Sequence, residues 1–386
     1  MSAPIRVVRI IARMNVGGPA QQITGLMAGL DPERYAQTLV VGDVGEDEED
    51  WLALKAPALA EDPRLIRLPR LSRSISPRDD LAAGRTLRRL LSDLAPDLVH
   101  THTAKAGLLG RRAAAAVGVP ARVHTFHGHV LHGYFSPTVG RAVALLERRL
   151  ARSTDALLAV GGRVRDELLQ AGIGQPSQYT VVPPGVQPPA QWERQAARAQ
   201  FGLDPATPVV AFVGRLAGVK RPDRMLAVAE RLTTLQPGTV MLVAGGATPE
   251  ELTALQAQVQ TADVRWLGWV GDVGAVYAAA DVVLLTSDNE GMPVSLIEAG
   301  MCGRPAVASE VGSVAEVVRD RHTGRVVPAE VGALADACAA LLADPDTAAR
   351  YGDAAAAHTH AAFSMDRLVA TTASVYDRVV SRQDRP

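Results

Sequence analysis

Two glutamates, Glu290 and Glu298, flank a turn and the start of an expected helix. They follow an apolar run, residues 281–286, which predicts a buried parallel strand. Pro293 lies at or near the first position of the helix. The N-terminus of a helix favours a phosphate group. A phosphate seat with a carboxylate on either side suits a nucleotide sugar, with ribose hydroxyls at one end and sugar hydroxyls at the other.

A second segment, residues 212–223, also follows an expected strand and precedes an expected helix. It brings Arg215 and Lys220 to the carboxyl edge of a sheet. Two cations at this edge would neutralise a diphosphate, arginine as a fork and lysine as a point charge. Ordinary surface charge is the alternative interpretation.

A third loop contains Gly17 and Gly18 directly after the first expected strand. Paired glycines let the backbone approach a ligand closely, and the helix that follows offers free amides. The loop is neither a G-x-G-x-x-G fingerprint nor a Walker loop. A tight turn without a ligand explains it about as well.

Six of the nine histidines gather at two places in the first half of the chain. Their spacing matches no standard zinc site, so we expect no bound metal. A neutral histidine that hydrogen bonds to a substrate hydroxyl is the more economical interpretation. His124 lies within a strand and is expected to be structural. The six are His100, His102, His124, His127, His129 and His132.

Three residues of the first half are candidates for the acceptor side of a site. His102 and Lys105 lie in a loop after a strand, although a helix-capping loop explains them nearly as well. His129 follows Gly128, which permits a tight backbone. His129 either lines the acceptor side or is simply exposed.

The expected elements alternate in the way that parallel sheets require. Short β-rich runs and helical segments follow one another from residue 5 to residue 182, and again from 209 to 343. Four prolines and a glycine within 182–189 mark a linker. We therefore expect two doubly wound α/β domains, 1–188 and 189–363, with the ligand in the cleft between them. A helix in 364–386 is expected to pack back on the first domain.

The composition agrees with a globular protein. The chain has 386 residues, 47% of them hydrophobic, and a net charge of −1, which argues against a dedicated nucleic-acid binder. Two cysteines fit a reducing, cytoplasmic compartment. No stretch reaches the roughly 18 apolar residues of a membrane span. An arginine-rich stretch, 64–89, is either a solvated face or a site for an anionic lipid or acceptor, so peripheral contact with the inner membrane face stays open.

These motifs together resemble the retaining family 4 ("group 1") glycosyltransferases, which have two facing Rossmann-like domains, the GT-B fold. The most specific element is E-x7-E, from Glu290 to Glu298. Gly214-Arg215-Leu216 with Lys220 matches the family's diphosphate motif, and Gly17-Gly18 matches its glycine loop. The resemblance covers nearly the whole chain. Residues 76–132 are most similar to capsular and exopolysaccharide-type members.

The resemblance implies a role for each matching residue. Glu298 would hold the ribose and Glu290 the donor sugar, while Arg215 and Lys220 would bind the diphosphate. His127 would contact the sugar on its 6-hydroxyl side, which makes His127, Arg215, Lys220 and Glu290 the expected catalytic group. The implied donor-binding residues are Gly17, Gly18, Val270, Gly291, Met292, Pro293, Val294, Ser295 and Glu298.

The implied reaction moves a hexosyl unit from a nucleoside diphosphate sugar, with UDP favoured, to a hydroxyl of a glycan, lipid-linked or small-molecule acceptor. Anomeric retention by front-face return needs no protein nucleophile, no metal and no cofactor besides the donor. Two alternatives stay open. One is a nucleotide-sugar 2-epimerase of the same two-domain fold, and the other is an inactive nucleotide-sugar-binding subunit.

Overall fold

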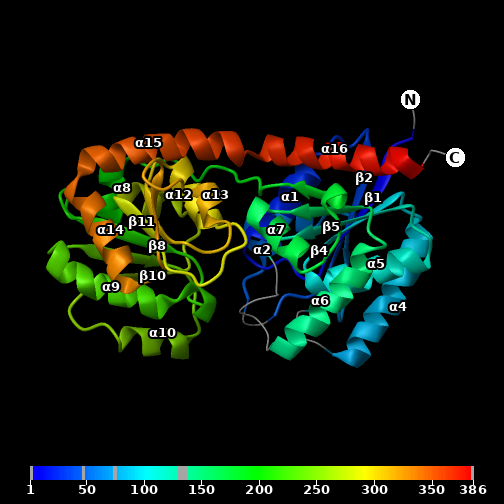
Figure 1. The fold of residues 1–386 in the computed structure, drawn as a ribbon, viewed down its shortest axis with the longest axis horizontal. Coiled ribbons are helices and arrows are strands. Elements are labelled where there is room, and N and C mark those ends of the chain that lie inside the picture. Colours follow the sequence, from blue (N-terminus) through cyan, green and yellow to red (C-terminus); the bar gives the residue numbers. More distant parts are fainter. Residues whose placement is uncertain (1–2, 46–47, 73–75, 129–136, 384–386) are drawn as a thin grey trace. The chain divides into compact units, whose positions relative to one another are not determined.

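The computed structural model describes residues 3–45, 48–72, 76–128 and 137–383 (Figure 1). The chain divides into two compact units. Unit 1 comprises Met1–Gly185 and Met365–Pro386, and unit 2 comprises Val186–Ser364. The sequence boundaries expected above were 188 and 363. Unit 1 is therefore built from two separate stretches of chain, whereas unit 2 is one continuous stretch.

Unit 1 is an α/β unit whose described part contains a seven-stranded parallel sheet in the order β3-β2-β1-β4-β5-β6-β7. The strands are β1 Ile5–Ile11, β2 Tyr35–Val41, β3 Leu65–Arg67, β4 Leu98–His102, β5 Ala121–Phe126, β6 Ala156–Ala159 and β7 Tyr179–Val181. The helices are α1 Gly18–Gly29, α2 Trp51–Lys55, α3 Pro57–Ala60, α4 Pro77–Leu94, α5 Ala104–Ala116, α6 Pro137–Ala151, α7 Gly162–Gln170 and α16 Met365–Gln383.

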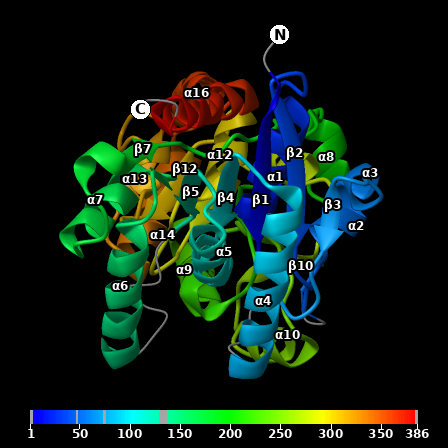
Figure 2. The ribbon, with the colours of Figure 1, turned by 90° about the vertical axis from the view of Figure 1, so that its right-hand side faces the viewer.

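Helices cover both faces of the unit 1 sheet. On one face α4 and α5 pack against β1 and β4 around Ile10, Leu87 and Val99 (Figure 2). On the other face α16 packs beside α1, and Tyr376 and Leu368 enter the core there. Burial of these apolar side chains stabilises the unit by roughly 1.5–3 kcal/mol for each large residue. Helix α16 is thus part of the core of unit 1.

Unit 2 repeats the arrangement with a described six-stranded parallel sheet in the order β10-β9-β8-β11-β12-β13. The strands are β8 Val209–Val213, β9 Val240–Ala244, β10 Asp263–Gly268, β11 Val282–Leu285, β12 Ala306–Ser309 and β13 Gly324–Val327. The helices are α8 Arg194–Gln200, α9 Pro222–Leu235, α10 Pro249–Gln256, α11 Gly274–Ala279, α12 Val294–Met301, α13 Val314–Val317, α14 Val331–Ala343 and α15 Pro345–Ala362.

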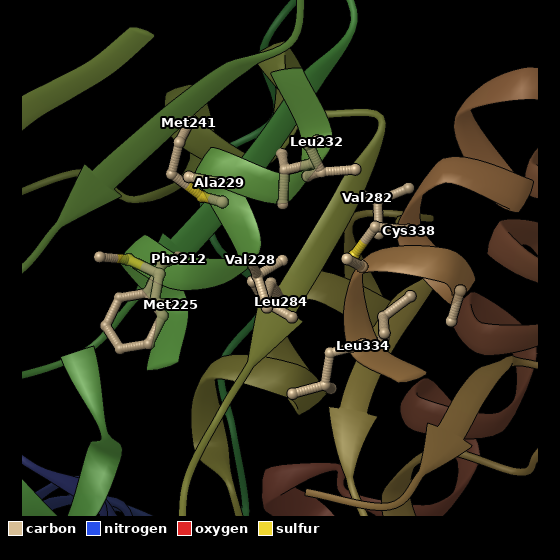
Figure 3. Close-up of a cluster of buried hydrophobic side chains, with 14 of the residues drawn as sticks. Phe212, Met225, Val228, Ala229, Leu232, Met241, Val282, Leu284, Leu334 and Cys338 are labelled. Carbon is tan, nitrogen blue, oxygen red and sulfur yellow. The ribbon is translucent and has the colours of Figure 1, made fainter. Parts of the chain in front are cut away.

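The core of unit 2 is continuous and apolar. Phe212 on β8, Met225 and Val228 on α9, and Leu334 and Cys338 on α14 are all buried there (Figure 3). Burial raises the pKa of the Cys338 thiol, so this cysteine behaves as a small apolar side chain. A rigid core of this kind holds the carboxyl ends of β8 and β11 in fixed positions.

The strand order has a consequence for both units. In each sheet the chain first builds outward from one strand, then returns and builds outward in the other direction, so that two neighbouring strands form a switch point. The switch lies between β1 and β4 in unit 1 and between β8 and β11 in unit 2. Loops that follow these strands diverge and leave room for a ligand.

Sequence reasoning placed the long elements well and missed short ones. Helix α4 begins at Pro77, because the Ser76 hydroxyl accepts a hydrogen bond from the amide of Asp79 and proline suits the first turn. The short helices α2, α3, α8 and α13 were not expected. None of them has the length that makes a helical period visible in a sequence.

Candidate functional site

The two candidate segments of unit 2 both follow switch-point strands. The loop from Gly214 to Arg221 follows β8 and ends in a short 3-10 turn, Gly218–Lys220. The loop from Thr286 to Pro293 follows β11 and leads into α12. Because β8 and β11 are paired neighbours, the structure brings these two loops together.

Glu290 is the centre of the polar contacts between the two loops. Its carboxylate is largely buried, with 9% of the residue exposed. Oε1 accepts hydrogen bonds from Lys220 Nζ at 2.6 Å and from Ser287 Oγ at 2.5 Å. Oε2 has no hydrogen bond to any residue in the described ranges. The buried charge is therefore compensated on one oxygen, and the other oxygen can accept a hydrogen bond from a ligand.

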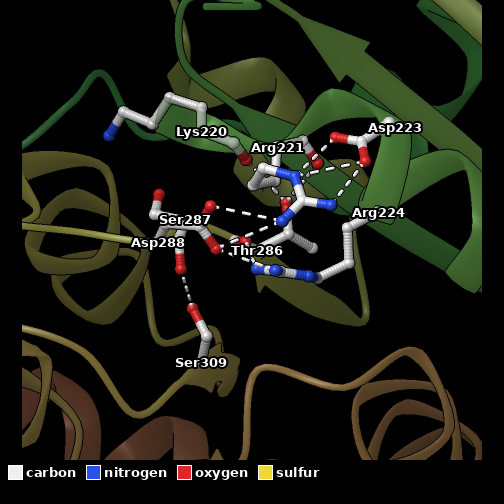
Figure 4. Close-up of polar contacts among 8 residues, drawn as sticks. All are labelled: Lys220, Arg221, Asp223, Arg224, Thr286, Ser287, Asp288 and Ser309. Carbon is white, nitrogen blue, oxygen red and sulfur yellow. Dashed lines mark hydrogen bonds and ion pairs between the residues drawn. The ribbon is translucent and has the colours of Figure 1, made fainter. Parts of the chain in front are cut away.

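A network of polar and charged side chains joins the two loops beside Lys220 (Figure 4). Arg221, with a left-handed φ of 52°, pairs with Asp223 at 2.6 Å and with Asp288 at 3.2 Å. The Thr286 hydroxyl donates to the carbonyl of Lys220 at 2.8 Å. Hydrogen bonds from Arg221 hold the pKa of Asp223 below its usual value. The network joins the two loops beside Lys220 and Glu290.

Two glycines allow close backbone approaches behind these loops. A Cβ on Gly245 would lie 1.8 Å from the carbonyl oxygen of Gly214, and a Cβ on Gly312 would lie 1.7 Å from that of Glu290. Gly312 also has a φ of 47°. Any larger residue would move the backbone that carries Arg215 or Glu290. Gly245 and Gly312 therefore allow the backbone on which the site residues are placed to pack closely.

Arg215 differs from Lys220. Its side chain is exposed, and it makes no hydrogen bond or ion pair with the described part of the chain. An exposed guanidinium beside Gly214 keeps its fork of N–H donors available for an anion.

The start of α12 carries five of the donor-side candidates. Pro293 is the N-cap residue, and no side chain caps the helix. The carbonyl of Pro293 accepts a hydrogen bond from the amide of Leu296 at 3.1 Å, so helical hydrogen bonding begins at the N-cap residue. Met292 and Pro293 are buried, whereas Gly291, Val294 and Ser295 are half-buried.

Glu298 is held by a tyrosine that sequence reasoning did not find. The hydroxyl of Tyr277, a buried residue of α11, lies 3.0 Å from Glu298 Oε2 and 3.0 Å from the carbonyl oxygen of Ser295. Burial and the neighbouring Glu298 carboxylate raise the pKa of Tyr277 well above its ordinary value. Tyr277 thus remains a donor. The segment around it is short and apolar, so no pattern pointed to this role.

Val270 lies after β10, in the same unit but beyond β9 in the sheet order. It is half-buried. Unit 2 therefore contains Val270 together with Arg215, Lys220, Glu290, Glu298 and the start of α12. The other expected residues belong to unit 1.

In unit 1 the glycine loop follows β1. Gly17 is the N-cap residue of α1 and Gly18 is its first residue, again without a capping side chain. The loop before them is held by backbone hydrogen bonds from Val16 to Glu49 and from Trp51 to Met14. Gly17 has space around it, since a Cβ there would meet only Pro19 at 3.9 Å.

His127 follows β5 and lies beside the carboxyl end of β4. Its Nε2 lies 2.9 Å from Nδ1 of His102. Loss of solvation lowers the pKa of His127 to about 3, so its imidazole is neutral. Burial also lowers the pKa of His102 well below its ordinary value. His102 is fully buried, so any effect that it has on a ligand must pass through His127.

The other two acceptor-side candidates have different outcomes. Lys105 Nζ forms an ion pair with Asp80 Oδ1 of α4 at 2.5 Å and is mostly buried. Lys105 therefore joins α5 to α4. His129 and His132 lie outside the described residues. His124 is buried and bonds to the hydroxyl of Thr101 at 2.8 Å, as a structural residue would.

Within the described ranges no group of three or more histidine, cysteine or acidic residues could hold a metal ion. In the same ranges, no helix combines the length and apolar character of a membrane-crossing segment.

Two family models match successive parts of the chain. Residues 17–185 match a glycosyl transferase 4-like domain, and residues 193–358 match "Glycosyl transferases group 1". The D-inositol 3-phosphate glycosyltransferase of Streptomyces bingchenggensis is 35% identical over 305 residues, 72% of this chain and 66% of the relative. The enzyme of the same name from Streptomyces coelicolor is 33% identical over 75% of this chain and 70% of its own length. The matched part thus spans about two thirds of these relatives.

Solved structures share the fold at lower identity. Anabaena Alr3699/HepE in complex with UDP and glucose is 19% identical, with a TM-score of 0.80 over 97% of this chain and all of that one. The sucrose-phosphate synthase of Thermosynechococcus elongatus has a TM-score of 0.78 at 20% identity over 98% of this chain and all of that one. A putative UDP-N-acetylglucosamine 2-epimerase from Listeria monocytogenes has a TM-score of 0.71 at 14% identity, over 100% of this chain and 99% of that one.

Proposed function

Since the chain belongs to the group 1 family of glycosyltransferases and has the GT-B fold, we propose that it transfers a hexosyl unit from a UDP-sugar to a hydroxyl acceptor with retention of anomeric configuration. The observation that carries the proposal is the Lys220–Glu290–Ser287 contact. It places a cation and a buried carboxylate with one unpaired oxygen between two loops that begin at the switch point of unit 2.

The proposal assigns the charges as follows. Lys220 and Arg215 bind the diphosphate, because both are cations at the carboxyl end of β8 and Arg215 has no other partner in the described part of the chain. When the glycosidic bond breaks, negative charge grows on the departing diphosphate. Donors fixed in advance, together with the amides at the start of α12, stabilise that charge.

The two glutamates have different tasks in this proposal. Glu290 Oε2 accepts a hydrogen bond from the donor sugar, while Oε1 stays bound to Lys220 and Ser287. Glu298, oriented by Tyr277, accepts from the ribose. Neither forms a covalent bond to the sugar. The leaving phosphate takes the acceptor proton as the new bond forms on the same face of the sugar.

A donor screen tests the class of reaction. The protein is incubated with UDP-, GDP- and ADP-sugars, and release of free nucleoside diphosphate is followed with and without acceptor. We expect acceptor-dependent release with a UDP-sugar. Release that never depends on an acceptor, or formation of an epimer of the donor sugar, would contradict transfer. The second result would favour the epimerase, whose fold is shared.

The acceptor and the stereochemistry need separate measurements. Inositol phosphate is the first acceptor to test, because relatives at 33–35% identity are named for D-inositol 3-phosphate. Glycans, glycolipids and small-molecule glycosides follow. NMR of the product shows whether the anomeric configuration of the donor is kept. Activity that persists in excess EDTA is expected, and loss restored by added Mg²⁺ would contradict a metal-independent reaction.

A cytoplasmic location with peripheral contact to the membrane is also part of the proposal. Cell fractionation at low and high salt tests it, because contact through the arginine-rich stretch 64–89 weakens as salt screens the charges.

A further inference from the structure

A chain of buried polar side chains runs along one face of the unit 1 sheet. His100 and His102 lie two residues apart on β4 and so point to the same face. Thr125 is the register partner of His102 on β5, and His127 follows two residues later. Arg9 is the register partner of His100 on β1, and Tyr376 of α16 covers them. The apparent acceptor-side residue His102 is therefore one member of a larger network.

The protonation of His100 follows from its partners. Arg9 can only donate, and its NH2 group lies 3.0 Å from the Tyr376 hydroxyl. That hydroxyl lies 2.6 Å from His100 Nδ1. The tyrosine accepts from Arg9 and donates to Nδ1, so His100 carries its proton on Nε2. The Nε2–H then donates to Thr125 Oγ1 at 2.7 Å. Every contact in this part of the chain has a donor and an acceptor.

His102 continues the network. Its ring lies against that of His100, with centroids 4.1 Å apart, and its Nδ1 lies 2.9 Å from His127 Nε2. Both rings of the His102–His127 pair are neutral, because burial disfavours the imidazolium form. In a hydrogen bond between two neutral imidazoles, one nitrogen must donate and the other must accept.

The unpaired nitrogen of His102 shows which ring donates in the hydrogen bond between His102 and His127. Its Nε2 is buried and has no hydrogen-bond partner in the described part of the chain. If His127 donated, His102 would carry a proton on this nitrogen and leave a buried N–H unpaired. If His102 donates, only a lone pair is left without a partner.

We propose that His102 is a positioning residue for His127, whose ring it orients by donating from Nδ1 to His127 Nε2. The Nδ1–H of His127 is then the one proton that this ring can donate to a ligand. This inference rests on the proposed function together with the role that the family resemblance implies for His127, namely contact with the donor sugar. His127 acts there as a neutral donor to a hydroxyl oxygen, and its Nε2 is not available as a base.

The state of the ring can be measured without any substrate. In protein labelled with ¹⁵N in the histidine rings, long-range ¹H–¹⁵N spectra distinguish protonated from unprotonated ring nitrogens. We expect His127 to show a protonated Nδ1 and an unprotonated Nε2, unchanged from pH 8 to pH 5. A proton on Nε2 in the unaltered protein would overturn the proposal.

Three variants separate positioning from general structural support. His102→Phe keeps the ring and removes the donor, so the His127 signals should change to a mixture of tautomers. His102→Asn places an amide N–H close to the former Nδ1 and should restore the unaltered pattern. His124→Asn is the matched control, because it removes an equally buried, singly hydrogen-bonded histidine of the same sheet. Unchanged His127 signals in His102→Phe would overturn the proposal.

Activity gives a second, independent readout. Loss of one oriented hydrogen bond should lower kcat/KM of His102→Phe by roughly 3- to 10-fold, with recovery in His102→Asn. In a double-mutant cycle the effect should disappear in a His127→Ala background. An equal loss in that background would show that His102 acts by another route and would overturn the proposal.

The outcomes distinguish this inference from the proposed function. If the unaltered protein shows the expected tautomer but transfers no sugar, the proposed function fails and the positioning of His127 stands. If transfer is observed while the tautomer is unaffected by His102→Phe, the positioning fails and the proposed function stands.

Discussion

Lys220 and Glu290 show how two side chains can have one role before a ligand arrives and another afterwards. In this structure the ammonium compensates a buried carboxylate at 2.6 Å. The same ammonium is the proposed partner of a diphosphate. A bound donor would thus share Lys220 with Glu290, and the carboxylate would turn its free oxygen to the sugar.

Replacing Lys220 tests this sharing. Lys220→Ala should lower kcat by about 100-fold or more, because a fixed cation next to developing charge contributes about that much. It also leaves Glu290 with one hydroxyl partner, which costs roughly 1–3 kcal/mol of unfolding free energy. Initial rates and urea unfolding measure the two effects. Lys55→Ala, at an exposed position in unit 1, is the control. Near-normal turnover of Lys220→Ala would refute the diphosphate assignment.

Tyr277 allows a finer test at the other glutamate. Tyr277→Phe removes one hydroxyl from a buried ring and leaves Glu298 without that donor. We expect KM for the donor to rise about 3- to 10-fold with little change in kcat, because the lost contact orients a binding group rather than a reacting one. Glu298→Ala should have a larger effect of roughly 1–3 kcal/mol on donor affinity. A fall in kcat alone after Tyr277→Phe would contradict a ribose role for Glu298.

At the scale of elements, the switch-point strands and the glycines behind them position these side chains. Alternating apolar runs and helical patterns in the sequence predicted β8, β11 and α12 close to where they lie, since an apolar run followed by a turn and a helix start has a clear signature. Sequence spacing also indicated Glu290, Glu298 and Lys220 as candidates. It did not reveal Tyr277 or Gly312, because their contacts join segments that only the folded unit brings together. It also did not reveal Ser287, whose contact with Glu290 depends on the shape of the turn between them.

Replacing Gly312 tests whether close backbone packing behind Glu290 is needed to position it. Gly312→Ala would place a methyl group 1.7 Å from the Glu290 carbonyl oxygen at a φ of 47°. Gly303→Ala is a matched control, because Gly303 has a φ of 67° but open space around it. Both variants should lose about 1–2 kcal/mol of stability from the left-handed backbone. Only Gly312→Ala should lose more than that and also lose donor binding. Equal behaviour in thermal unfolding and donor titration would show that the contact is unimportant.

At the scale of the whole molecule, the described part of unit 1 contains four neutral histidines, namely His100, His102, His124 and His127. Their folded pKa values lie below 6.5, the value of an ordinary ring, chiefly because of burial. Below pH 6.5 these histidines therefore bind protons in the unfolded chain, whereas in the folded chain they stay neutral. The contribution to stability is full above pH 6.5 and falls as the pH falls toward the folded values, about 3 for His127.

Urea unfolding at pH 7.0 and pH 5.5 measures this dependence. For each neutral histidine, the free energy of unfolding should fall by about 1 kcal/mol when the pH is lowered from 7.0 to 5.5. The sum is a large part of the ~5–15 kcal/mol that stabilises a typical domain. In the His124→Asn variant the dependence on pH should be weaker by one histidine. A free energy that stays level between the two pH values would contradict neutral buried rings.

The composition of unit 1 also determines the order in which the protein can form. A ribosome that has made residues 1–364 has completed unit 2, but Tyr376, Leu368 and Val375 of the unit 1 core do not yet exist. The N-terminal stretch must therefore wait, with the α16 side of its sheet uncovered, while the later stretch folds. During synthesis this apolar face stays exposed to other nascent chains until residues 365–383 have been made.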